Sequence, residues 1–250
     1  NFVAVETAAV PILTFDWCAI NIDLLFARLP HTLTVPPDFD IDNDAVLDGA
    51  DAATEKSLNG PRVTNLIAAF CNGTSDRYQA FLHTVRCVRV WAKARGLYSN
   101  KMGYWGGVNC NLAVALTVLL YPNSSPMTLL RKFFLVMDTW RWPQPMMLTE
   151  PHDAGFGLTV WKKENAHRQV APMITPAYPA MNSTLSCSRQ TLQVLTQEFS
   201  RGRKSIEEMW HRFQQDPLTE LDWSKLFAKA DFFTAYPVRC LFEISNSLIV

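Results

Sequence analysis

The hydrophobic pattern divides the chain into a β-type opening and a longer helical remainder. Apolar residues fill positions 10–13, and we expect residues 14–17 to form a turn. From residue 20 to 26, one set of apolar side chains alternates with a second, partly polar set. This period of two predicts a strand, with Ile20 and Ile22 on one face and Asp23 on the other.

A helical spacing of apolar positions begins at Ser57 and continues through most of the chain. Residues 76–95 predict one helix, because Gly96 follows as a left-handed C-terminal cap. Residues 108–121 predict a second helix, which stops at Pro122. The middle of the chain is therefore expected to be mainly helical.

Capping signals predict further helices toward the C-terminus. Ser125, followed by a proline, is typical of the start of a helix. Residues 188–201 and a segment opening with the capping box 205–208 are expected to be two helices, separated by Gly202. Residues 238–245 predict a strand.

An acidic segment at residues 36–55 precedes the helices. Its alternating aspartates invite comparison with a calcium-binding EF-hand loop. The spacing fails, because Ala45 stands where the loop needs glycine and Asp51 stands where it needs glutamate. We therefore interpret the segment as a solvated connector.

Composition indicates a chain with a sizeable core, since 48% of its 250 residues are hydrophobic. The 23 basic and 23 acidic residues cancel, so any nucleic-acid surface requires clustered cations. The apolar run at residues 112–121 is about half the length of a membrane span, so no membrane partner is expected. The six cysteines contain no CxxC pair and predict neither a disulfide framework nor a zinc site. The aromatic residues Phe133, Trp140 and Trp142 are assigned to the core.

Candidate chemistry first appears on the helix predicted at residues 76–95. Arg86, Arg89 and Lys93 recur at i, i+3 and i+7, which places three cations on one stripe. A solvated basic face is one interpretation. The alternative is a row of cations that faces a phosphate group, because Tyr98 and a glycine-rich turn at residues 103–107 follow directly.

An ordered series of motifs resembles the eukaryotic, nuclear type of poly(A) polymerase. The resemblance covers nearly the whole chain, and terminal uridylyltransferases fit the motifs less well. The motifs are INIDLLFARL at 20–29, SLNGPRVT at 57–64, WAKARGLYSN at 91–100, GYWGGV at 103–108, KFFLV at 132–136, WRWP at 140–143, ITPAYPAMNST at 174–184, WSKLF at 223–227 and FF at 232–233.

The resemblance implies an α+β fold in three parts. Residues 1–30 would be the C-terminal end of the palm sheet in a nucleotidyltransferase catalytic domain. Residues 31–230 would form a helical central domain that includes the acidic connector 36–55. Residues 231–250 would be the first strand of an RRM-like RNA-binding domain. On this template the chain is a fragment that lacks the N-terminal part of the first domain and most of the last.

The implied reaction is attack by an RNA 3′-hydroxyl on the α-phosphate of ATP, which adds AMP and releases pyrophosphate. Two Mg²⁺ ions, or alternatively Mn²⁺, would be held by three carboxylates. Asp23 would be the third of these, both catalytic and metal-binding. The first two would lie upstream of residue 1, so the chain alone is expected to be inactive. Asp40 and Asp42 have the spacing of the missing pair, but they follow Asp23 and are rejected as replacements.

The resemblance also assigns the triphosphate of ATP to Arg89, Lys93 and Tyr98. Arg89 stands where the family usually has a lysine, which retains the charge but changes the contact geometry. The base and sugar are assigned to six residues: Ile12, Asn59, Asn100, Gly107, Val108 and Thr175. Among these, an asparagine amide can pair with the adenine edge, and glycine permits close backbone approach.

The expected function is thus mRNA polyadenylation in the nucleus by a polynucleotide adenylyltransferase. Its expected partners are ATP, the RNA 3′ end and cleavage and polyadenylation factors. Two alternatives stay open. The protein could be a non-catalytic RNA-binding or interaction module derived from such an enzyme, or a terminal nucleotidyltransferase that uses UTP or CTP.

Overall fold

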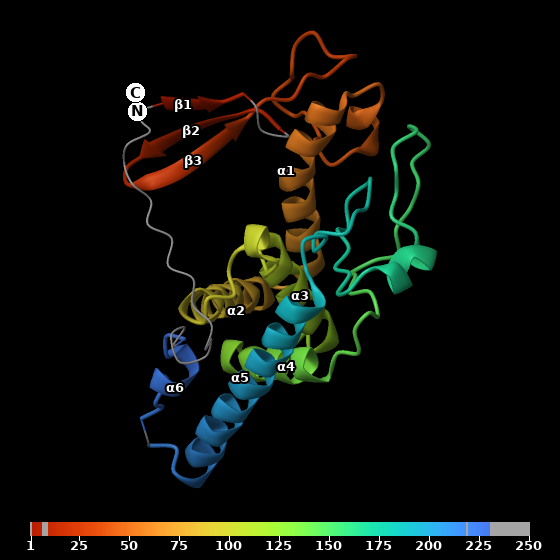
Figure 1. Ribbon diagram of the computed structural model, residues 1–250. Helices are drawn as coiled ribbons and strands as arrows, with labels where there is room; N and C mark the ends of the chain where they lie inside the picture. The colour runs from red at the N-terminus through yellow and green to blue at the C-terminus, as the bar shows by residue number, and fades with distance from the viewer. Residues whose placement is uncertain (1, 7–9, 219, 231–250) are drawn as a thin grey trace, which may run out of the picture.

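The chain opens with a three-stranded antiparallel sheet in the order β1-β2-β3 (Figure 1). A computed structural model describes residues 2–6, 10–218 and 220–230. The strands are β1 Phe2–Val5, β2 Ile12–Trp17 and β3 Ile20–Leu25. In Figure 1 the sheet lies beside the N-terminal end of the first helix, α1.

The turn between β2 and β3 differs from the prediction. Residues 14–17 were expected to turn, but they belong to β2, and the turn consists of Cys18 and Ala19 with φ of 49° and 62°. A two-residue hairpin loop with positive φ at both positions usually contains glycine or asparagine. The predicted strand at residue 20 and beyond is confirmed.

The strand register confirms the face assigned to Asp23. Thr14 pairs with Asp23 and Ile12 pairs with Leu25. Because paired residues share a face and neighbours alternate, Ile12 and Asp23 lie on one face, opposite Ile22.

The acidic connector leads into α1, Ala52–Cys71. It contains the short 3-10 helix η1, Asp44–Leu47. The helix α1 begins five residues before the expected start at Ser57. Asp51 is its N-cap, with a side chain that accepts a 2.7 Å hydrogen bond from the Thr54 amide.

The helices α2 Ser75–Ala94, α3 Gly107–Leu120 and α4 Pro126–Thr139 confirm three predictions. Gly96 has φ of 71°, as a left-handed cap requires. Ser125 accepts a hydrogen bond from the Thr128 amide at the start of α4. The α+β class is therefore confirmed, with short 3-10 helices at Asn100–Met102 (η2) and Lys163–Arg168 (η3).

The helix α5, Arg189–Gln215, contradicts the predicted break at Gly202. The residue is buried in the helix interior, where an added Cβ would lie 2.3 Å from Cε1 of Phe134. Glycine is thus needed for close packing of α4 against α5, not for a cap. The short helix α6, Ser224–Phe227, follows, and the strand expected at 238–245 lies outside the described residues.

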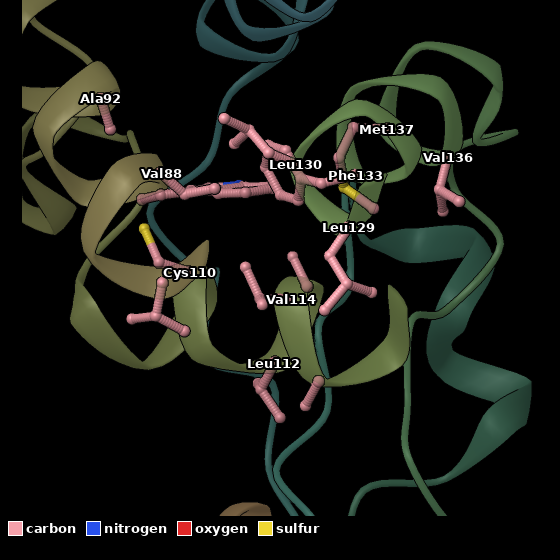
Figure 2. Close-up of a cluster of buried hydrophobic side chains, with 14 of the residues drawn as sticks. Val88, Ala92, Cys110, Leu112, Val114, Leu129, Leu130, Phe133, Val136 and Met137 are labelled. Atoms are coloured by element: carbon pink, nitrogen blue, oxygen red, sulfur yellow. The ribbon is translucent and has the colours of Figure 1, made fainter. Parts of the chain in front are cut away.

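The core lies where α2, α3, α4 and α5 meet. Trp91 stacks on Phe199 with ring centroids 5.6 Å apart and meets Phe134 edge-on at 5.1 Å. Figure 2 shows Val88 of α2 and Phe133 of α4 in the same apolar cluster. The assignment of Phe133 to the core is confirmed, and Trp140 and Trp142 pack partly buried against that core.

The described part of the chain contains five cysteines, and all five are free: Cys18, Cys71, Cys87, Cys110 and Cys187. None of its helices combines the length and the apolar character needed to cross a membrane.

Candidate functional site

A cleft of about 310 Å³ opens where α1, α2, α3 and the loop at residues 174–183 come together. The three helices pack on one another (Figure 1). The cleft is lined by Asn59, Gly60, Val63, Thr64, Arg89, Gly107, Val108, Asn111, Thr175, Met181 and Ser183. Five residues assigned to ATP from the sequence are therefore gathered from four separate segments.

Asn59 is the contribution of α1 to the polar lining. Its Nδ2 donates a weak hydrogen bond to Sδ of Met181 at 3.3 Å. Its Oδ1 is buried and has no hydrogen-bond partner. An unsatisfied buried acceptor is uncommon in proteins, so this oxygen is available to a donor from a bound molecule.

Arg89 on α2 meets the first turns of α3. Its Nη2 donates to Oδ1 of Asn111 at 2.9 Å. A Cβ atom at position 107 would lie 3.1 Å from the Tyr98 hydroxyl and 3.3 Å from Nη2 of Arg89. The absence of a side chain at Gly107 thus lets the hydroxyl and the guanidinium come close to the helix backbone.

The start of α3 adds backbone donors to the same wall. Gly106 is the N-cap and has no side chain to accept hydrogen bonds from the first turn. The Asn109 side chain turns back and accepts from the Gly106 amide at 2.8 Å. The N-terminus of a 14-residue helix favours negative charge nearby, as does the cation on Arg89.

Lys93, Tyr98 and Asn100 do not line the cleft directly. The ammonium of Lys93, an exposed residue, lies over the Tyr98 ring at 5.1 Å from its centroid. The Tyr98 hydroxyl reaches the cleft wall at Gly107. Asn100 is exposed in η2 and accepts a hydrogen bond from the Ser186 hydroxyl at 2.5 Å.

The loop at residues 174–183 is held by internal hydrogen bonds. The Thr175 hydroxyl accepts from the Met181 amide at 3.0 Å. The Ser183 hydroxyl donates to the carbonyl of Met173 at 2.8 Å and accepts from Asn109 at 2.7 Å. These bonds fix the loop against α3, so its cleft-facing side chains are held in place.

Arg62 of α1 holds the same loop through a hydrogen bond to its backbone. Its side chain is 1% exposed, donates to the Tyr178 carbonyl at 2.5 Å and forms an ion pair with Asp44. His152 also binds the Asp44 carboxylate, at 2.7 Å. The buried Arg62 side chain therefore joins α1, the acidic connector and the loop that lines one side of the cleft.

Asp23 and Ile12 lie on the sheet and do not line the cleft. The Asp23 carboxylate is exposed and accepts a 2.7 Å hydrogen bond from the Thr14 hydroxyl. Its second oxygen has no protein partner among the described residues, so this oxygen can serve as one ligand of a hard cation. No cluster of three potential metal-binding side chains occurs in the described part of the chain.

Comparison with known proteins accounts for this arrangement. A profile of the poly(A) polymerase nucleotidyltransferase domain matches residues 1–70, and a profile of the poly(A) polymerase central domain matches residues 80–229. The chain belongs to the poly(A) polymerase family. The central-domain profile alone covers more than half of the sequence.

Similar poly(A) polymerases occur in Arabidopsis thaliana. Nuclear poly(A) polymerase 4 is 41% identical over 235 residues, which is 93% of this chain and 30% of the relative. Nuclear poly(A) polymerase 1 is 40% identical over 246 residues, covering 96% and 32%. Nuclear poly(A) polymerase 2 is 40% identical over 93% of this chain and 28% of its own length. The chain spans about three-tenths of each relative.

The sequence did not single out several residues that line the cleft of this poly(A) polymerase chain. Met181 and Ser183 belong to a motif noted above but were not assigned a role. Asn111 had one available signal, because it is one of two asparagines, with Asn109, in the first turns of a mainly apolar α3. Its significance depends on Arg89, 22 positions earlier, which periodicity alone cannot connect to it.

Proposed function

We propose that this chain supplies the nucleotide-binding cleft of a polynucleotide adenylyltransferase that adds AMP from ATP to RNA 3′ ends. The observation that carries the proposal is the convergence of five residues on one cleft. The family resemblance assigns five of the lining residues to the nucleotide: Asn59, Arg89, Gly107, Val108 and Thr175. In the fold they line a single cavity.

The triphosphate would lie beside Arg89, the charged residue of the lining, and the base would lie against the uncharged part of the cleft. Arg89, the Tyr98 hydroxyl and the N-terminus of α3 supply donors for the triphosphate, with Lys93 beside them. Val108 and Thr175 would flank the base and sugar, with Asn59 providing an acceptor. Asn100, exposed in η2, would reach the base only from the outer edge.

Asp23 would act as a catalytic carboxylate and hold Mg²⁺, or Mn²⁺, together with other carboxylates. The metal supplies charge neutralisation for the triphosphate and lowers the pKa of the RNA 3′-hydroxyl when bound. The Thr14 hydroxyl orients one oxygen of Asp23 and leaves the other for the cation. Ile12, on the same face, would lie against the nucleotide from the sheet side.

The domain assignment belongs to the same proposal. Residues 1–30 would complete the catalytic domain, residues 31–230 would form the central domain, and residues 231–250 would begin the RNA-binding domain. The relatives are named nuclear poly(A) polymerases. These names support a location in the nucleus. Cleavage and polyadenylation factors are the partners that we propose for the enzyme.

A chimeric enzyme tests the proposal. Residues 1–250 replace the matching segment of Nuclear poly(A) polymerase 4, and extension of an RNA primer is measured with each of the four nucleoside triphosphates. We expect Mg²⁺-dependent extension with ATP and roughly a hundredfold preference over UTP and CTP, because a hydrogen-bonding site rejects bases that leave its polar groups unpaired.

Two results would contradict this function. Equal use of UTP or CTP would indicate a terminal nucleotidyltransferase of different specificity. A folded chimera that binds RNA but extends no primer, while the parent enzyme does, would indicate a non-catalytic module. The same chimera carrying Arg89→Met is the control for the cleft and should be impaired.

A further inference from the structure

The side chain of Arg89 is hydrogen-bonded to a neutral residue, Asn111, whereas a buried arginine is commonly paired with a carboxylate. Its Nη2 donates to Oδ1 of Asn111 at 2.9 Å, across the contact between α2 and α3. Both residues line the cleft, and both are half-buried. Among the described residues, no carboxylate lies within ion-pair distance of Arg89.

A neutral acceptor and a charged acceptor have different consequences for the cleft. An asparagine oxygen orients a guanidinium without cancelling its charge, whereas an aspartate in the same place would neutralise it. The full charge of Arg89 therefore remains available to an anion. At the same time, the hydrogen bond restricts a long side chain that would otherwise sample many rotamers.

The guanidinium also retains an unused donor. Nε of Arg89 is buried and has no hydrogen-bond partner. A buried donor of this kind is costly unless a partner is supplied. The Tyr98 hydroxyl and Nη2 both lie close to Gly107, so a phosphate oxygen at this end of the cleft would meet several donors together.

We propose that Asn111 is a positioning residue, which fixes the guanidinium of Arg89 for a phosphate group of the bound nucleotide while preserving its charge. The inference rests on the proposed function, since it names the ligand of the same cleft. The guanidinium is planar, so a hydrogen bond from Nη2 to Asn111 also fixes the directions of its other N–H groups toward the ligand.

Binding by the complete 250-residue chain tests the inference, with ATP and inorganic tripolyphosphate as probes. Asn111→Ala should weaken both by about three- to tenfold, the worth of one net hydrogen bond. Asn111→Asp should weaken both by roughly tenfold or more, because its carboxylate neutralises Arg89 and repels the anion. Asn123→Asp, the same substitution at an exposed position beyond α3, should leave both affinities unchanged.

A double-mutant cycle separates positioning from a direct contact. In the Arg89→Met background, Asn111→Ala should produce no further loss of affinity, because nothing remains to be positioned. In the unliganded chain, Asn111→Ala should also change the NMR signal of the Arg89 side-chain NεH while leaving the melting temperature within about 2 °C.

The outcomes distinguish this inference from the proposed function. If Asn111→Ala weakens binding equally with and without Arg89, or does not weaken it at all, the positioning role is wrong while the nucleotide cleft stands. If the wild-type chain binds neither probe, both the cleft's function and the role of Asn111 are wrong. If Asn111→Ala lowers both the affinity and the melting temperature, Asn111→Asp separates a loss of positioning from a loss of folding, because it keeps the shape of the side chain.

Discussion

The cleft and the sheet of this chain are built in opposite ways. Behind the cleft, Val88 and Cys110 are completely buried in the main core, so the walls are fixed by packing. No described residue of the sheet reaches full burial, and Trp17 and Ile20 are 66% and 63% exposed. The geometry of the cleft is therefore determined mainly by the packing of the helices, whereas the direction of Asp23 rests on strand register and one hydrogen bond.

This difference implies that nucleotide binding and metal-dependent chemistry can be separated by mutation. The cleft should bind the nucleotide without Asp23, because no sheet residue lines it. Changes on the sheet should affect turnover while leaving the fold of the helices intact.

The largest expected effect is on turnover by the chimera. Asp23→Asn should lower primer extension by roughly a thousandfold, because an amide is a poor ligand for a divalent cation. Binding of metal-free ATP by the 250-residue chain should stay within about twofold. Asp16→Asn, on the same sheet face, is the matched control and should retain turnover. A thousandfold loss with both variants would show that Asp23 has no special role.

The next effect is on the free energy of unfolding. Phe199→Ala removes a completely buried ring that stacks on Trp91, and it should lower that energy by about 3–5 kcal/mol. Trp17→Ser on the sheet should change it by less than about 0.5 kcal/mol. Urea unfolding followed by circular dichroism measures both. Similar losses of unfolding free energy in both variants would mean that the sheet is packed as tightly as the helical core.

How much could be predicted from the sequence depended on the range of the interactions. Gly96 and Ser125 were assigned correctly, because their caps involve neighbours within one helical turn. Gly202 resembled a cap in sequence, and only its contact with Phe134 of another helix explains it. The hairpin at Cys18 was missed because the local sequence lacks the usual glycine or asparagine.

The candidate site shows the same limit. The resemblance singled out Arg89 and Gly107, and the structure places both in the cleft. It could not single out Asn111, whose role depends on the packing of α2 against α3. It also placed Asn100 with the nucleotide, although its side chain lies in an exposed turn and pairs with Ser186.

A smaller effect concerns the pH dependence of the helical part. Burial alone would raise the pKa of Glu198, but hydrogen bonds and charges from Arg95 and Arg201 outweigh it and lower the pKa below 4.5. Because the folded-state pKa is depressed, this stabilisation is present above the ordinary pKa of a glutamate and is lost as the pH falls through the lowered value. Both arginines also bind carbonyls near α6.

Glu198→Gln should remove this part of the pH dependence, with denaturant midpoints measured on either side of pH 4.5 as the readout. Glu208→Gln is a suitable control, since its partner Lys225 and its own side chain are both 57% exposed. An unchanged acid profile in Glu198→Gln would show that the ion pairs of Glu198 with Arg95 and Arg201 contribute nothing to acid sensitivity.

The most direct test of the account is the affinity of the 250-residue chain for ATP with Arg89 or Arg86 replaced by methionine. Both residues belong to the basic stripe on α2, but only Arg89 lines the cleft, and Arg86 is exposed. The account predicts that Arg89→Met weakens ATP binding by about tenfold or more, the worth of charge-assisted hydrogen bonds, and that Arg86→Met leaves it unchanged. Equal affinities for the two variants would contradict the placement of the nucleotide in this cleft.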